Sequence, residues 1–149
     1  MISFLIKMKN CFLPFFALLF LACNNDQLEP LNENEVNKNK WEALNLDSYS
    51  FTLQISCFCT EETTQPKEVK VVNNKIILVN ETPYNPEQHW GVLTISQFFD
   101  EIENAEREEV FILTVEYDKD KGFPNYIYID REEMIADEEI GYTVTNMKY

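Results

Sequence analysis

One stretch of the chain constrains the fold more than any other. From Tyr49 to Cys59, every second residue is apolar, and polar residues stand between them up to Ser56. Because the side chains of a strand point alternately to its two faces, this pattern predicts a β-strand with one face in a hydrophobic core. The face predicted to be buried carries Tyr49, Phe51, Leu53, Ile55, Cys57 and Cys59, and the opposite face carries Ser50, Thr52, Gln54 and Ser56.

Further strands are predicted on both sides of this one. Asn73 and Asn74 separate two apolar segments, and asparagine tolerates the positive φ of a tight turn, so a hairpin is expected there. The segment from Val110 to Tyr117 is apolar on both sides, which predicts a strand in the centre of the sheet. The other predicted strands are Glu68 to Val72, Lys75 to Asn80, Asn125 to Asp130 and Tyr142 to Lys148.

Two segments show helical spacing. A short helix is expected near Asn37 to Leu46, with Trp41, Leu44 and Val36 on one face. Thr94 and Gln97 form a capping-box pair that predicts the start of a second helix. Its apolar face would carry Ile95, Phe98, Phe99, Ile102 and Ala105. The predicted fold is α+β, with a mainly antiparallel sheet of five to six strands and one or two helices packed on one face.

The first residues have the pattern of an export signal. Lys7 and Lys9 precede an apolar run from Cys11 to Leu21, which fits a signal-peptide core and is too short to span a bilayer. Met8 is as good a translation start as Met1, because a complete leader follows either one.

The apolar run ends at Ala22-Cys23, and polar residues follow at once. A cysteine after a small residue at this position resembles a bacterial lipobox, although Phe20 stands where that motif usually has leucine. The resemblance implies cleavage before Cys23 and acylation of Cys23; buried acyl chains would then anchor the protein. The alternative is an ordinary secretory signal in which Cys23 is coincidental.

These observations divide the chain into three parts. Residues 1–22 are the predicted signal peptide, residues 23–36 a flexible lipid-anchored tether, and residues 37–149 a single domain. We expect the domain to be held at the cell envelope by the acyl groups on Cys23. The outer membrane is the favoured membrane, and the domain would lie in the periplasm or at the cell surface.

The charge balance restricts the partners. The chain has 26 acidic and 12 basic residues, a formal net charge of −14. A surface of this sign repels nucleic acid and anionic lipid headgroups, so no nucleic-acid partner is expected. An acidic surface favours solubility and can also bind cationic partners or divalent ions. Solubility is the simplest explanation of the charge.

The Cys57-Phe58-Cys59 segment is the first candidate for chemistry. Two residues of strand separate the Cα atoms by about 6.6 Å, at the upper limit for a disulfide, so pairing needs a bend or the end of the strand. An oxidising envelope favours pairing where the geometry permits it. Bound metal is the alternative, because two thiolates suit Cu(I) or half of a zinc site. A third interpretation is that Cys57 and Cys59 are simply small buried residues that extend the apolar face of the strand.

Two other segments are weaker candidates. The loop from Pro83 to Trp90 carries Tyr84, His89 and Trp90, which could form a contact surface or, in the case of Tyr84 and Trp90, fold back over the core beside Phe98. Asp118, Asp120 and Asp130 are weak candidates for calcium ligands, because their spacing does not match the EF-hand pattern. Aspartate is also common in hairpin turns, which gives these residues a structural explanation.

A set of short motifs resembles a family of small bacterial envelope proteins catalogued only as a domain of unknown function. The resemblance spans nearly all of the domain, from Trp41 to Tyr142, and it implies a single-domain lipoprotein without an assigned activity. The motifs are Trp41, Tyr49-Ser-Phe51, Cys57-Phe-Cys59, Val69-Lys-Val71, Thr94 to Asp100, Tyr117-Asp118, Gly122-Phe-Pro124, Ile129-Asp130 and Ala136-Asp-Glu138.

No catalytic constellation or phosphate-binding loop is recognisable in the sequence. The leading expectation is a non-enzymatic binding or assembly module tethered by lipid, with no cofactor and with an unknown protein or small ligand as partner. The alternative is a metal-binding or thiol-redox protein that uses Cys57 and Cys59.

Overall fold

One sheet organises the protein in the computed structural model, which describes residues 32–149. Cys23 and the predicted leader lie outside these residues. The helices are α1 (Glu33–Glu42), α2 (Glu61–Thr64) and α3 (Ile95–Glu108). The strands are β1 (Tyr49–Cys57), β2 (Lys67–Val72), β3 (Lys75–Val79), β4 (Thr82–Pro83), β5 (Ile112–Tyr117), β6 (Pro124–Asp130) and β7 (Ile140–Lys148). Within the described part, no helix has the length and apolar character to cross a bilayer.

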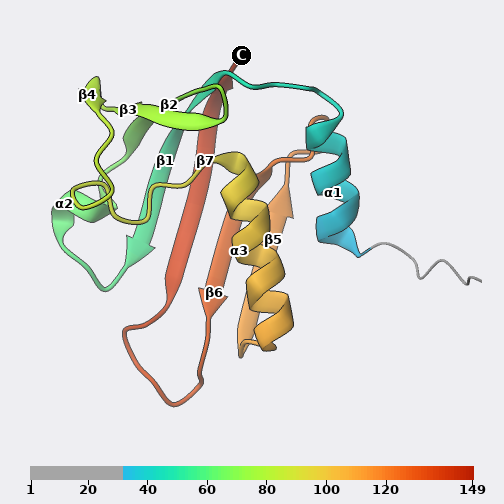
Figure 1. The fold of residues 1–149 in the computed structure, drawn as a ribbon. Helices are drawn as coiled ribbons and strands as arrows, with labels where there is room; N and C mark the ends of the chain where they lie inside the picture. The colour runs from blue at the N-terminus through green and yellow to red at the C-terminus, as the bar shows by residue number, and fades with distance from the viewer. Residues whose placement is uncertain (1–31) are drawn as a thin grey trace, which may run out of the picture.

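The strands form a single antiparallel sheet in the order β4-β3-β2-β1-β7-β6-β5 (Figure 1). This confirms the α+β class and the mainly antiparallel sheet. The predicted count of five to six strands is wrong, because the structure has seven. The unpredicted strand is β4, whose two residues pair with the end of β3 and are too few to leave a periodic pattern in the sequence. The single turn α2 was missed for the same reason.

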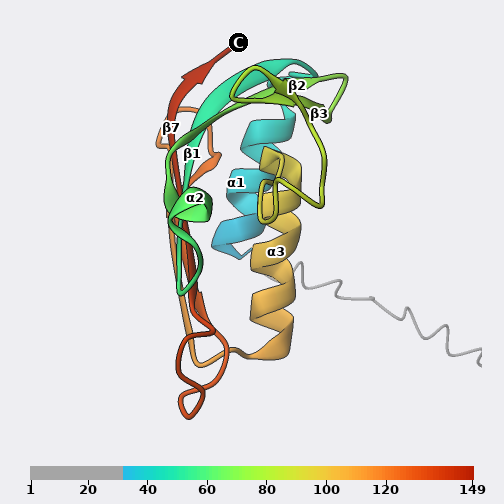
Figure 2. The same ribbon diagram turned by 90° about the vertical axis from the view of Figure 1, so that its left-hand side faces the viewer.

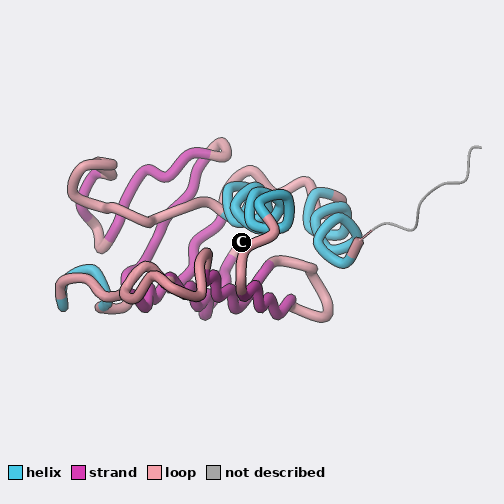
Figure 3. The backbone as a smooth tube through the Cα atoms, turned by 90° about the horizontal axis from the view of Figure 1, so that it is seen from below, coloured by secondary structure: helices cyan, strands magenta, loops and turns pink. Residues whose placement is uncertain are grey.

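Helices α1 and α3 cover the same face of the sheet (Figures 2 and 3). Helix α3 has the predicted capping box: Thr94 Oγ1 accepts from the Gln97 N–H, and Gln97 Oε1 accepts from the Thr94 N–H. Its predicted apolar face is buried against the strands. The core lies between the two layers and contains Trp41, Phe51, Leu53, Ile55, Phe98, Phe99, Ile102, Ile127 and Ile129.

The predicted boundary between tether and domain is wrong, because α1 begins at Glu33 and residues 33–36 are helical. The side chain of Asn32 caps the helix by accepting from the Glu35 N–H at 2.7 Å. The expected helix face is also incorrect. Trp41 is buried, but Val36 is 49% and Leu44 is 38% exposed. The other buried residue of α1 is Asn34. Its side-chain amide donates to the Phe99 carbonyl and accepts from the Tyr117 hydroxyl.

The segment predicted to be a central strand is an edge strand. Strand β5 pairs only with β6, and exposed residues alternate along it with half-buried ones. Leu113 and Val115 pack against the core, whereas Ile112 is 40% exposed. Strand β5 therefore carries apolar residues on both faces although only one face packs against the core. The central strands are β1 and β7, which come from opposite ends of the domain.

Two turns depend on residues with positive φ. Asn73 and Asn74 have φ values of 50° and 58°, which confirms the hairpin between β2 and β3. Gly122 has φ +80° in the turn before β6, and a Cβ atom there would lie 2.6 Å from the Asn37 carbonyl oxygen. Glycine is therefore required at this position both for the turn and for the close approach of α1.

Candidate functional site

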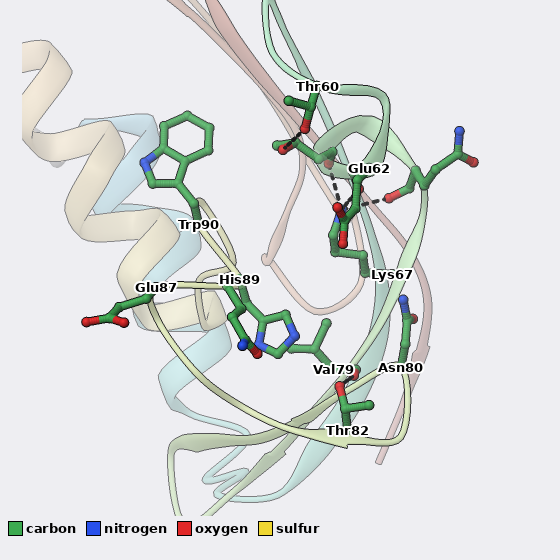
Figure 4. Close-up of a pocket in the computed structure, with 12 residues that line it drawn as sticks. Thr60, Glu62, Lys67, Val79, Asn80, Thr82, Glu87, His89 and Trp90 are labelled. Atoms are coloured by element: carbon green, nitrogen blue, oxygen red, sulfur yellow. Dashed lines mark hydrogen bonds between the residues drawn. The ribbon is translucent and has the colours of Figure 1, made fainter.

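A cleft of about 760 Å³ opens between α2 and the loop that leads from β4 to α3 (Figure 4). Segment 60–67 forms one wall, with Lys67 at its base. The other wall is the end of the loop, with His89 and Trp90, and the ends of β3 and β4 complete the floor.

Lys67 fixes the first wall. Its Nζ donates to the carbonyl oxygens of Glu62, Thr63 and Gln65 at 2.9, 2.6 and 3.1 Å, so its three protons are all used by the turn of α2. The residue is only 8% exposed. This burial lowers the pKa of the Lys67 ammonium, and the carboxylate of Glu62 opposes that shift. The lysine thus ties α2 to the sheet and has no proton left for a ligand.

Backbone hydrogen bonds hold the second wall. The Nδ1 atom of His89 accepts from the Asn85 N–H at 3.0 Å, and the His89 N–H donates to the Asn85 carbonyl at 2.8 Å. The imidazole stacks on Tyr84, with ring centroids 5.8 Å apart. Because Nδ1 accepts this hydrogen bond, the ring hydrogen lies on Nε2. The loop therefore offers one donor from His89 to the cleft.

The structure separates the three residues of the predicted contact loop. Tyr84 is half-buried and packs against the core, behind His89. Trp90 is 57% exposed and does not fold back over Phe98. His89 and Trp90 are thus brought together at the cleft, and Tyr84 supports them.

A second cleft, of about 380 Å³, lies beside the first and shares Trp90 with it. The residues that line it include Cys57, Phe58, Cys59, Arg131 and Glu138. Cys57 and Cys59 form a disulfide with a Cα–Cα distance of 5.3 Å at the point where the chain leaves β1. Because the strand ends at Cys57, Cys59 is exposed rather than inward-facing as predicted. Phe58 between them is 79% exposed.

Arg131, which lines this second cleft, makes two ion pairs. Its guanidinium pairs with Glu101 at 2.7 Å and with Glu108, which joins α3 to the connection between β6 and β7. One oxygen of Glu138 accepts from the Arg131 and Glu132 N–H groups, at 2.8 and 2.7 Å, and closes that connection on itself.

The candidate metal ligands do not converge. The sulfur atoms of Cys57 and Cys59 are bonded to each other, so neither is a free thiolate. Asp118 accepts from the Asp120 and Lys121 N–H groups in the turn before β6, whereas Asp130 lies at the other end of that strand. From residue 32 onward, no group of three or more His, Cys, Asp or Glu residues is placed to hold a metal ion.

Lys67 and Arg131 were not predicted from the sequence. Lys67 could have been found, because it shares the inward face of β2 with Val69 and Val71. A lysine in such a row must bury its charge against hydrogen-bond acceptors. For Arg131 there was no comparable signal, since its partners Glu101 and Glu108 are distant in sequence.

Reduction of the disulfide should have a modest effect on stability. Few residues lie in the closed loop, so chain entropy predicts a loss of about 1.5 kcal/mol in the free energy of unfolding. Denaturant titration with and without a reductant would measure it. A Cys57→Ser/Cys59→Ser double variant should be insensitive to the reductant. Complete unfolding on reduction would contradict the expectation.

Comparison with known proteins gives one positive finding. A family model described as "Family of unknown function (DUF6174)" matches residues 33–149, which include every described element. Neither the curated proteins nor the solved structures give a match.

Proposed function

Because this chain belongs to the DUF6174 family, whose description assigns no activity, we propose a function from its own residues: it is a lipid-anchored envelope protein that binds a basic partner in the cleft beside Trp90. The lipid anchor and the binding site are separate parts of this proposal, and each has its own support.

The lipid anchor is supported by the leader. A basic start, an apolar run of signal-peptide length and a cysteine directly after Ala22 are the features that lipoprotein processing requires. The family match begins at residue 33, where α1 begins. Residues 23–32 therefore precede the family domain and provide a connection between Cys23 and the folded part.

The observation that carries the binding proposal is the exposure of Trp90 in an acidic setting. Glu62 and Glu87 line the cleft together with Trp90, whose exposed fraction is 57%. Lys67 is the one cation among the described residues that line it, and its protons are bound by carbonyl groups. A cleft lined by an exposed indole and by acidic residues attracts an ammonium or guanidinium group by cation–π and charge interactions.

The lipid anchor is tested by replacing Cys23. Full-length protein expressed in a lipoprotein-processing bacterium should carry acyl groups by intact mass and should fractionate with membranes. Cys23→Ser should lose both properties, whereas Cys11→Ser should keep them because Cys11 lies before the cleavage site. Membrane fractionation of an unacylated Cys23→Ser protein at the wild-type level would contradict the proposal.

The binding site is tested with a displayed library of random peptides. Selection on the protein should enrich lysine- and arginine-containing sequences. Trp90→Ala should weaken the binding of an enriched peptide at least tenfold, and Trp90→Phe should retain most of it. Ile77→Ala, which removes an exposed apolar side chain from β3, is the matched control. Enrichment of acidic sequences, or equal binding by Trp90→Ala, would overturn the proposal.

Thiol–disulfide exchange at Cys57 and Cys59 is a second candidate. The specific observation in its favour is the exposure of Cys59 at the mouth of the second cleft, where another thiolate could reach its sulfur. Equilibration in glutathione buffers followed by alkylation would decide. Retention of the disulfide throughout the glutathione range would leave it a purely structural bond.

A further inference from the structure

Several exposed apolar side chains gather at one end of the protein. Met134, Phe58, Ile135 and Phe111 are 90%, 79%, 51% and 49% exposed. Phe58 follows β1, Phe111 lies between α3 and β5, and the other two lie in the connection from β6 to β7. In two perpendicular views this connection extends beyond the end of the sheet (Figures 1 and 2). We refer to these four residues as the apolar end.

Contacts join the three segments that carry the apolar end. The Phe111 N–H donates to the Arg131 carbonyl at 3.2 Å, which places the start of β5 beside the β6–β7 connection. Phe58 and Arg131 both line the second cleft. The three segments therefore lie at the same end of the sheet, and apolar residues exposed on neighbouring loops are typical of an interaction site.

The described chain begins beside the last turn of α3. The side chain of Asn32, the first described residue, donates to Glu106 Oε2 at 3.0 Å. Glu106 lies in the last turn of α3, which ends just before Phe111. Residues 23–31 therefore link Cys23 to Asn32, which lies beside the last turn of α3. Nine residues span at most about 30 Å when fully extended.

We infer that the apolar end rests on the phospholipid bilayer that holds the acyl groups of Cys23. The inference depends on the proposed lipid anchor, because that anchor brings the bilayer within reach of this end. Apolar side chains on loop tips gain free energy by leaving water for the boundary of the acyl region. The opposite end of the sheet, where β3 and the C-terminus lie, would then point away from the membrane (Figure 1).

The charges around the apolar end define the kind of lipid. Glu132, Glu133, Asp137, Glu138 and Glu139 lie in the same connection as Met134 and Ile135. Carboxylates are repelled by anionic headgroups and tolerate zwitterionic ones. The preferred surface is therefore rich in phosphatidylcholine or phosphatidylethanolamine. The cleft beside Trp90 is lined by α2 and β3 along the flank of the sheet, so this orientation leaves it open to a partner.

The test uses full-length acylated protein in phosphatidylcholine vesicles that contain a phospholipid with a diazirine in its acyl chain. After irradiation, mass spectrometry of peptides should find lipid adducts on residues 57–60 and 131–137. Peptides with Ile77 or Tyr149 should remain unlabelled. Met134→Ser/Ile135→Ser should lower labelling at both Phe58 and the 131–137 segment several-fold. Ile77→Ser, at the opposite end, is the matched control and should change nothing.

The outcomes separate this inference from the proposed lipid anchor. Acylated protein that is labelled only in residues 23–31, or equally at both ends of the sheet, would overturn the inference and leave the anchor in place. Protein without acyl groups by intact mass would overturn both. Replacing part of the phosphatidylcholine by phosphatidylglycerol should reduce labelling of residues 131–137, and an increase would contradict the orientation.

Discussion

Phe98→Ala is expected to lower the free energy of unfolding by about 3–5 kcal/mol, the range for an aromatic side chain removed from a packed core. Phe98 is fully buried in α3, and its ring meets that of Tyr142 edge-on at a centroid distance of 5.1 Å. The substitution removes this contact and leaves a cavity between the helix and the centre of the sheet. Denaturant titration followed by circular dichroism measures the change.

The control for this prediction has the same chemistry at a different place. Phe58→Ala also deletes a benzyl group, but Phe58 is 79% exposed. Its free energy of unfolding should therefore change by no more than about 0.5 kcal/mol. Similar losses in the two variants would mean that α3 does not form the second layer of the core.

Alkaline pH is expected to destabilise the fold sharply through its buried tyrosines. Burial raises the pKa of Tyr142 to about 12, and the nearby carboxylate of Glu101 adds to this shift. Burial also raises the pKa of Tyr49, although the Ile95 N–H that donates to its hydroxyl oxygen opposes the shift. The pKa of Tyr117 is raised by burial and by Glu106 and Glu33. Unfolded tyrosine ionises near pH 10.

The sign follows from proton binding. Above about pH 10 the unfolded chain releases tyrosine protons that the folded protein retains, so ionisation favours unfolding. The stabilisation is complete below about pH 10 and is lost as the pH rises towards about 12. The slope is about 1.4 kcal/mol per pH unit for each buried tyrosine. Unfolding titrations over this range should show a flatter dependence for Tyr142→Phe, and identical slopes in variant and wild type would contradict the assignment.

Local patterns predicted the elements whose residues contact their own neighbours. The alternation from Tyr49 gave β1 because one face of that strand is fully covered. The capping pair at Thr94 gave the start of α3, since both hydrogen bonds lie within one turn. Asn73 and Asn74 gave the hairpin because the turn depends on their own φ values.

The errors arose where distant residues decide the outcome. Helix α1 begins early because Asn34 finds partners in Phe99 and Tyr117, which are remote in sequence. Strand β5 lies at the edge because β1 and β7 pair at the centre, and hydrophobicity alone does not reveal this order. At the candidate site, His89 and Trp90 were identified by residue type. The opposite wall at Lys67 depends on the carbonyls that its ammonium binds.

The pairing of β1 with β7 has a consequence for the order of folding. Residues 50–57 of β1 pair with residues 140–148 of β7. The middle of the sheet therefore closes a loop that contains almost the whole domain. Such long-range pairing is slow, because the entropy of loop closure precedes the contacts that compensate for it. During synthesis, β1 has only β2 as a partner until β7 has emerged. The centre of the sheet therefore stays incomplete until β7 is available.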